Sequence, residues 1–207
     1  MSSHHVVREN QEAAVFVNDL NILNMDALQN TFQWSPIIVA DENTFLDLVE
    51  LGYKIDCIIC QQIFAESHND FIRNQHPIEV IFINDPSEII QVGINFLIGR
   101  NSLYIYLFSS ISIDDYFKLS IRNENVSVTL FNNGYHYSVL KDGFKKWFAL
   151  GDRVILTTID HNNSIKIELP DGSFEIITGN KTINYNFNVE GIHKFQLAKP
   201  IIIGWKN

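Results

Sequence analysis

The chain has 207 residues, of which 46% are hydrophobic, and this length permits one large core or two smaller ones. Its 24 acidic and 15 basic side chains give a net charge of -9, which repels phosphate backbones and anionic lipid surfaces. We therefore expect a small-molecule ligand, no nucleic acid and no membrane. No signal peptide is expected, and the apolar runs are shorter than the roughly 20 residues that span a membrane, so we predict a cytoplasmic protein.

Strand-like and helix-like patterns alternate through the first 120 residues. In chain order they predict strand 13–17, helix 22–32, strand 37–40, helix 45–51, strand 57–60, a polar stretch at 65–77, strand 80–83, helix 86–97 and strand 103–108. Parallel strands need crossover connections, and strand-helix-strand units supply them. The pattern therefore predicts a mostly parallel, Rossmann-like α/β domain over residues 1–120.

The spacing of the two cysteines, Cys57 and Cys60, is compatible with a redox pair or half of a zinc site. They lie in a β-branched run typical of a buried strand, where residues three apart point to opposite faces. No second Cys/His pair lies nearby, so we interpret both as core thiols.

Beyond residue 120 the pattern changes to short alternating runs separated by turn signals. Those signals are Asn133-Gly134, Asp142-Gly143 and Asp171-Gly172. Hairpin signals at such short intervals predict an antiparallel β-sandwich or barrel domain over residues 121–207. The predicted class is thus α/β followed by a β-rich domain.

The order of several short segments resembles thiamine pyrophosphokinase. The segments are Pro36–Asp41, Leu51–Ile59, Asn84-Asp85, Ser112-Ile113-Asp114, Leu150–Leu156 and Gly191-Ile192. They correspond to a strand ending in Asp, a helix ending near Leu-Gly, a Thr-Asp pair, an Arg-x-Asp-His segment, a Gly-Asp strand and a GxSN segment. The resemblance implies transfer of a pyrophosphoryl group from ATP to thiamine, with Mg²⁺ held by carboxylates, and it implies a homodimer.

Three aspartates match positions of this pattern and are the candidate catalytic residues. They are Asp41, Asp85 and Asp114, with Asp85 as the candidate metal ligand. Each lies at or near a predicted strand end, where ligands bind in open α/β sheets. A structural alternative stays open, because Asp41 and Asp85 are equally good helix N-caps and Asp114 suits a solvated turn.

The chain departs from the family pattern at three places. Cys60–Phe64 stands where the family has GDxDS, so two carboxylates are missing, although Gln61 and Gln62 can hydrogen-bond a polar ligand. Ser112 replaces a phosphate-pairing arginine. Gly191 and His193 are candidate ligand-binding residues, whereas Lys194 beside them disfavours the thiazolium cation.

Three hypotheses follow. The first is a thiamine-pyrophosphokinase-like protein with weak or lost catalysis and a residual ligand site, in which Mg²⁺ and ATP have no role. The second is an active, divergent enzyme that uses Mg²⁺ and ATP through Asp41, Asp85 and Asp114. The third is a structural or interaction module whose cleft is filled by side chains such as Phe64.

Overall fold

A computed structural model describes residues 12–20, 31–32, 35–158, 164–178 and 181–206. The chain forms two compact units, the first from residues up to Ser112 together with Leu119–Asn133, and the second from Ile113–Lys118 together with the residues from Gly134 onward. The predicted helix 22–32 lies mostly outside the described residues. Within the described residues, no helix is long and apolar enough to cross a membrane.

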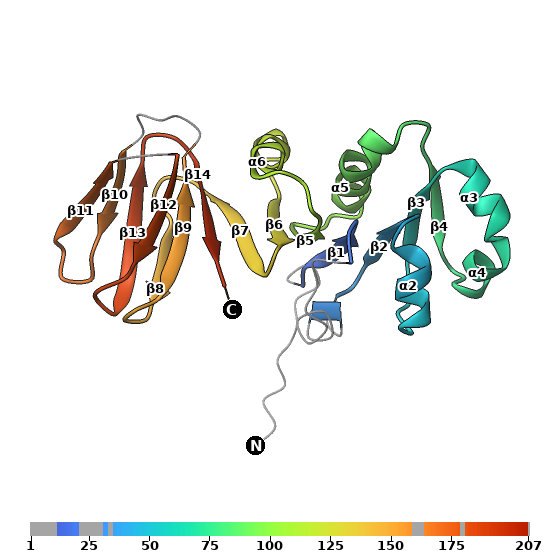
Figure 1. Ribbon diagram of the computed structural model, residues 1–207, viewed down its shortest axis with the longest axis horizontal. Helices are drawn as coiled ribbons and strands as arrows, with labels where there is room; N and C mark the ends of the chain where they lie inside the picture. The colour runs from blue at the N-terminus through green and yellow to red at the C-terminus, as the bar shows by residue number, and fades with distance from the viewer. Residues whose placement is uncertain (1–11, 21–30, 33–34, 159–163, 179–180, 207) are drawn as a thin grey trace, which may run out of the picture. The chain divides into compact units, whose positions relative to one another are not determined.

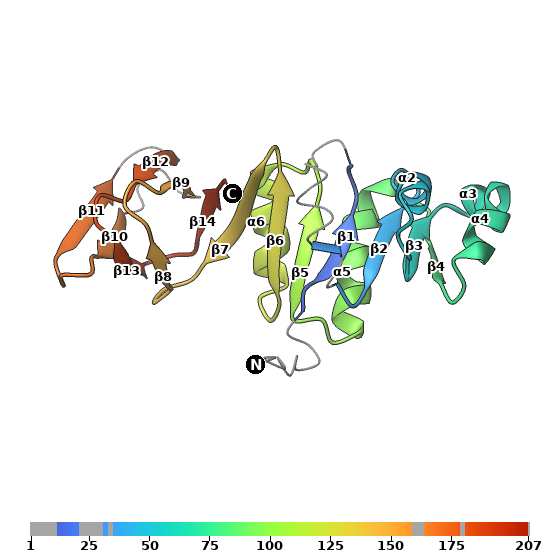
Figure 2. The ribbon, with the colours of Figure 1, turned by 90° about the horizontal axis from the view of Figure 1, so that it is seen from below.

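The first unit is built on a parallel sheet whose strands lie in the order β6-β5-β1-β2-β3-β4 (Figure 2). The strands are β1 (Ala14–Val17), β2 (Ile38–Asp41), β3 (Cys57–Cys60), β4 (Glu79–Phe82), β5 (Tyr104–Phe108) and β6 (Ser127–Asn132). All neighbouring pairs in this order are parallel. The predicted parallel sheet is confirmed.

Helices connect these strands. They are α2 (Phe45–Glu50), α3 (Gln62–Ser67), α4 (Asn69–Asn74), the 3-10 helix η1 (Pro86–Glu88), α5 (Ile89–Gly99) and α6 (Ile113–Arg122). The stretch 65–77, for which the sequence predicts no element, contains half of α3 and all of α4. Only Ile72 of these two short helices is buried, so their apolar pattern is weak.

Helices cover both faces of the parallel sheet, with α2 and α5 on opposite sides (Figure 1). Phe45 and Leu48 of α2 share one core with Val15 and Val17 of β1. On the other face, α5 approaches Phe16 so closely that a Cβ on Gly93 would lie 2.4 Å from the ring carbon Cε1. Side chains alternate along a strand, which explains why β1 is buried on both faces.

Both cysteines are buried, free thiols, as the sequence predicted. Burial raises the pKa of Cys57 to about 12 and that of Cys60 to about 11. Thiolate is the reactive form of cysteine, so these thiols are suited to packing.

The second unit contains two antiparallel sheets, in the orders β12-β9-β14-β7 and β11-β10-β13-β8 (Figure 1). Its strands are β7 (Tyr135–Leu140), β8 (Lys145–Phe148), β9 (Arg153–Thr157), β10 (Ser164–Glu168), β11 (Phe174–Thr178), β12 (Thr182–Asn186), β13 (Gly191–Leu197) and β14 (Ile201–Trp205). Leu156 and Ile203 of the first sheet share one core with Ile167 and Phe195 of the second. The arrangement is that of a β-sandwich.

The division of the chain differs from a single cut at residue 120. Strand β6 lies beyond that residue, yet it pairs in parallel with β5, with Phe131 beside Phe108. The alternating pattern of residues 127–132 predicted a strand correctly, but such alternation does not specify the direction of its neighbour. The chain therefore passes between the units at Ser112, Lys118 and Asn133.

Candidate functional site

The carboxyl edge of the parallel sheet has a point where the strand order reverses. From β1 the chain continues to β2 on one side, whereas β5 lies on the other side of β1. Ligands of open α/β sheets bind at such a switch point, just beyond the carboxyl ends of the strands. The loops that begin at Asn18 and Ser109 meet at this point.

A hydrogen-bond network joins the loops after β1, β2 and β5. The Asn18 side-chain amide donates to Oδ2 of Asp41 at 2.7 Å, and the Ser109 hydroxyl donates to Oδ1 of Asn18 at 2.7 Å. The backbone amides of Asn18 and Asp19 both donate to the carbonyl of Phe108, at 2.8 and 3.1 Å. Residues distant in sequence thus form one polar cluster.

Asp41 is fully buried and forms the centre of this cluster. Its Oδ1 accepts from the backbone amides of Asn43 and Thr44, at 3.1 and 3.0 Å, and lies 2.9 Å from the Thr44 hydroxyl. Burial raises the pKa of the Asp41 carboxyl, while hydrogen bonds from Thr44, Asn18 and Asn43 act in the opposite direction. These bonds hold the turn that leads from β2 into α2.

The side-chain amide of Asn132 lies at the carboxyl end of β6. It is 9% exposed, and its Nδ2 donates to the carbonyl of Ile111 at 3.1 Å. Among the described residues its Oδ1 has no hydrogen-bond partner. Because the preceding residue, Phe131, accepts from the backbone amide of Ser109, Asn132 is close to the switch point. A buried acceptor of this kind is normally satisfied by an ordered water or a ligand, so Asn132 is a candidate ligand-binding residue.

Asp85 is exposed and caps η1, where its Oδ1 accepts from the backbone amide of Ser87 at 2.9 Å. This hydrogen bond lowers the pKa of the Asp85 carboxyl.

Gln61 and Gln62 follow β3, on the same edge of the sheet as Asp41. The backbone amide of Gln61 donates to Oε2 of Glu42 at 2.9 Å, and the side chain of Gln62 donates to Glu66 at 2.7 Å. We had not singled out Glu42 in the sequence.

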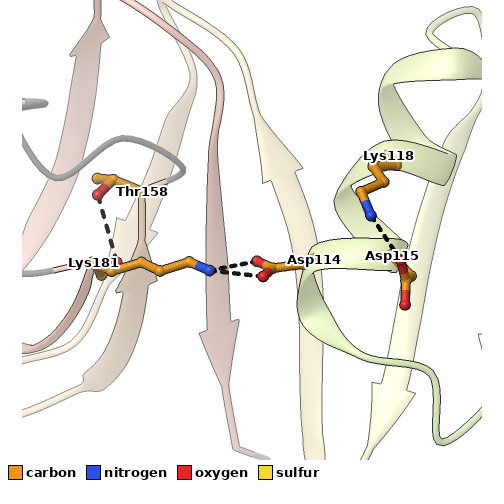
Figure 3. Close-up of polar contacts among 5 residues, drawn as sticks. All are labelled: Asp114, Asp115, Lys118, Thr158 and Lys181. Atoms are coloured by element: carbon orange, nitrogen blue, oxygen red, sulfur yellow. Dashed lines mark hydrogen bonds and ion pairs between the residues drawn. The ribbon is translucent and has the colours of Figure 1, made fainter.

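Asp114 belongs to the second unit, in the first turn of α6. The Lys181 ammonium group points toward it and lies 2.7 and 2.8 Å from its two carboxylate oxygens (Figure 3). The neighbouring carboxylate, Asp115, pairs with Lys118 at 3.0 Å (Figure 3). Both oxygens of Asp114 therefore face a cation of the same unit.

Gly191 and His193 also belong to the second unit, on β13. Gly191 has a φ of +137°, and a Cβ there would lie 2.7 Å from Cγ of Pro170, so glycine is required at this close approach. His193 is fully buried and makes T-shaped contacts with the rings of Phe148 and Phe187, which stack on each other. Its Nδ1 lies 3.0 Å from the carbonyl of Gly191, and its Nε2 has no partner among the described residues.

The structure thus brings Asp41 together with Asn18 and Ser109. Gln61 and Gln62 follow the neighbouring strand on the same edge, whereas Asp85 caps η1 after β4. Across the described ranges, no group of three or more His, Cys, Asp and Glu side chains lies close enough to hold a metal ion. The sequence patterns do not select Asn18, Ser109 or Asn132 for this site.

The two units together define a class of protein with a parallel α/β sheet and an antiparallel β-sandwich. No family model matches the sequence, and no curated protein matches it significantly. Solved structures do match. The thiamine pyrophosphokinase of Geobacillus thermodenitrificans superposes with a TM-score of 0.69 and 10% identity over 94% of this chain and 97% of that one. The thiamine pyrophosphokinase of Bacillus subtilis superposes with a TM-score of 0.66 and 13% identity over 94% of this chain and 99% of that one.

The yeast thiamine pyrophosphokinase gives a TM-score of 0.62 and 9% identity over 97% of this chain and 87% of the yeast chain. Each of the three matches includes both units. The protein has the thiamine pyrophosphokinase fold, as the order of its sequence segments predicted.

Proposed function

We propose that this is a thiamine-pyrophosphokinase-like protein that binds a small polar ligand at the β1–β5 switch point and has weak or no pyrophosphoryl transfer activity. The observation that carries this proposal is the hydrogen bonding of the Asp41 carboxylate. Both of its carboxylate oxygens are engaged by donors of the chain itself. Asp41 therefore holds the loops of the site in place and leaves ligand recognition to neutral amides and hydroxyls.

The donor set at this edge does not fit the Mg²⁺ that the family resemblance implies. Magnesium prefers carboxylate and phosphate oxygens in octahedral geometry. Here Asp41 is committed to internal hydrogen bonds, one oxygen of Asp85 accepts from Ser87, and glutamines follow β3. Neutral amide oxygens bind a hard cation weakly, so we derive no catalytic step through a metal.

Asn132 indicates what kind of ligand fits. Its unpartnered Oδ1 is an acceptor, and Asn132 directly follows Phe131, whose carbonyl accepts from the backbone amide of Ser109. A ligand hydroxyl or amino group that donates to Asn132 would satisfy this buried oxygen. The hydroxyl of thiamine and the amino or hydroxyl groups of a nucleoside have this chemistry.

The main experiment measures thiamine diphosphate formation from thiamine and ATP with and without Mg²⁺. We expect no turnover above background. Robust Mg²⁺-dependent turnover would instead establish the active, divergent enzyme, and in that case Asp85→Asn should abolish it. Asp85→Asn is an informative variant because Asp85 is exposed and its loss leaves the core intact.

Calorimetry with ATP, thiamine and its phosphates then tests for the ligand site. Asn132→Ala should weaken binding about tenfold, because the deleted oxygen is the acceptor for the ligand. Asn95→Ala, on the exposed surface of α5, is the matched control and should bind like the original chain. If none of these compounds produces heat, the protein is better described as a structural or interaction module.

The family resemblance also motivates a homodimer, which we retain as a proposal. Sedimentation equilibrium over a range of protein concentrations tests it directly. A mass that stays at the 23.8 kDa of one chain would refute the dimer.

A further inference from the structure

A pocket of about 220 Å³ opens in the second unit, beside strands β8, β10 and β13. Two ammonium groups, Lys145 and Lys194, and one carboxylate, Glu168, provide its charged lining. Leu169, Pro170 and Ile192 provide its apolar lining. It lies in the unit that does not contain the switch point.

The two lysines face each other across a strand pair. Lys194 of β13 is directly opposite Lys145 of β8 on one side and Glu168 of β10 on the other. Like charges directly opposite each other on neighbouring strands destabilise a sheet. A charge of the opposite sign is needed to relieve this repulsion.

The chain supplies little of that charge. The Lys194 ammonium lies 3.9 Å from Oε2 of Glu168, which also accepts from Gln196 at 3.4 Å. Among the described residues Lys145 has no ion pair. The lining thus has two lysines and one carboxylate, and that carboxylate is shared between Lys194 and Gln196, so the pocket keeps a net positive charge.

The apolar side of the pocket is exposed to an unusual degree. Ile192 is 59% exposed, and Trp147, directly opposite it on β8, is 54% exposed. The close contact of Gly191 with Pro170 fixes the β10–β11 turn against the start of β13. The pocket therefore combines a positive rim with a fixed apolar wall.

We propose that this pocket binds a small organic phosphate, with the phosphate between Lys145 and Lys194 and its apolar part against Ile192 and Pro170. Lysine ammonium groups bind phosphate as point charges, and partial exclusion of water strengthens the pairing. The same charge disfavours a ligand whose ring is cationic and carries no phosphate. This site is separate from the switch point, and the proposal does not depend on the function proposed above.

Phenyl phosphate, an anion, is a suitable probe because two compounds with a similar ring differ from it in charge. Phenol is neutral, and benzyltrimethylammonium is a cation. Titration calorimetry on the intact chain at low salt should show phenyl phosphate binding, at least tenfold weaker binding of phenol, and no binding of benzyltrimethylammonium. Affinity should fall as salt is raised, since the rim is solvent-exposed. Inorganic phosphate should bind more weakly than phenyl phosphate, because it leaves the apolar wall uncovered.

Lys145→Gln and Lys194→Gln should each weaken phenyl phosphate binding about fivefold to tenfold. Lys166→Gln is the matched control, because Lys166 lies in β10 but outside the pocket lining, with its ammonium 3.8 Å from the centre of the Phe174 ring. Circular dichroism checks that the variants stay folded. The proposal is overturned if a variant with both lysines replaced, Lys145→Gln and Lys194→Gln, binds phenyl phosphate as tightly as the original chain. It is also overturned if Lys166→Gln loses as much affinity as the pocket variants.

The ligand site at the switch point is tested by a different variant, so the two proposals fail separately. Asn132→Ala should leave phenyl phosphate affinity unchanged, because Asn132 belongs to the first unit. A loss of phenyl phosphate binding in that variant would show that the probe occupies the switch point and would overturn the pocket assignment.

Discussion

The Asn18 side-chain amide donates a 2.7 Å hydrogen bond to the buried carboxylate of Asp41, from a loop 23 residues earlier in the sequence. This bond connects the carboxyl ends of β1 and β2. Asn18 in turn accepts from Ser109, so a single amide side chain joins three loops. The positions of these three loops therefore depend on side-chain hydrogen bonds as well as on the pairing of the strands.

The first prediction concerns the stability supplied by Asp41. Asp41→Ala should reduce the free energy of unfolding by about 3 kcal/mol, because it leaves the buried donors of Asn18 and Thr44 without acceptors. Asp41→Asn should cost less, since its carbonyl oxygen still accepts from Thr44 and the Asn18 amide can rotate. Urea denaturation measures both. Glu50→Ala, an exposed carboxylate in α2, is the control, and an equal loss there would contradict the prediction.

The second prediction concerns pH. Burial raises the pKa of Asp41 in the folded protein above the ordinary 3.8, so the folded state binds this proton more tightly than the unfolded state. The resulting stabilisation is complete below the unfolded pKa and is lost as pH rises through the folded pKa. The original chain should therefore gain stability relative to Asp41→Asn as pH falls from 7 toward 4. Paired urea titrations across this range measure the difference, and a relative loss on acidification would refute it.

The third prediction uses two glycines of α5. Gly93→Ala should destabilise the protein by about 1–3 kcal/mol, because its new methyl group would overlap the Phe16 ring. Gly99→Ala meets no atom within 4 Å and should be neutral or stabilising by up to about 1 kcal/mol, since alanine favours the helix. Thermal unfolding of the two variants provides the comparison. Similar melting temperatures would show that α5 can move away from β1.

The fourth prediction concerns the cysteines. Their raised pKa values and burial should make Cys57 and Cys60 unreactive toward a thiol reagent such as Ellman's reagent at pH 8 in the folded protein. Two equivalents should react once urea unfolds the chain. Rapid reaction of either thiol under native conditions would contradict their role as core residues.

Much of the parallel sheet could be predicted from the sequence because its central strands β1, β2 and β3 are buried on both faces. The predicted strand 57–60 coincides with β3, and Gly52 ends the preceding helix with a φ of +86°. The 65–77 stretch is harder to predict, since Ile72 is the one fully buried residue of α3 and α4, and Phe64 and Ala65 pack against the core only in part. The direction of β6 could not be predicted, because local alternation carries no information on its partner.

The residues of the candidate site were predictable from the sequence only in part. The end of β2 identified Asp41 as a residue at the carboxyl edge. Its partners were not predictable, because Ser109 and Asn18 are 91 residues apart and meet only when β5 pairs with β1. Asn132 lies at the end of a strand that we assigned to the other half of the chain. Local sequence patterns predict where strands end, but predicting which strand ends meet in a site also requires knowledge of the strand order in the sheet.

Three consecutive residues of β13 point alternately to the two faces of its sheet. His193 faces the sandwich core, whereas Ile192 and Lys194 line the pocket on the opposite face. Mutations at the two pocket positions can therefore change the charge and shape that a ligand meets without disturbing the core. The surface of this β-sandwich can therefore be altered one residue at a time while the packing beneath it stays the same.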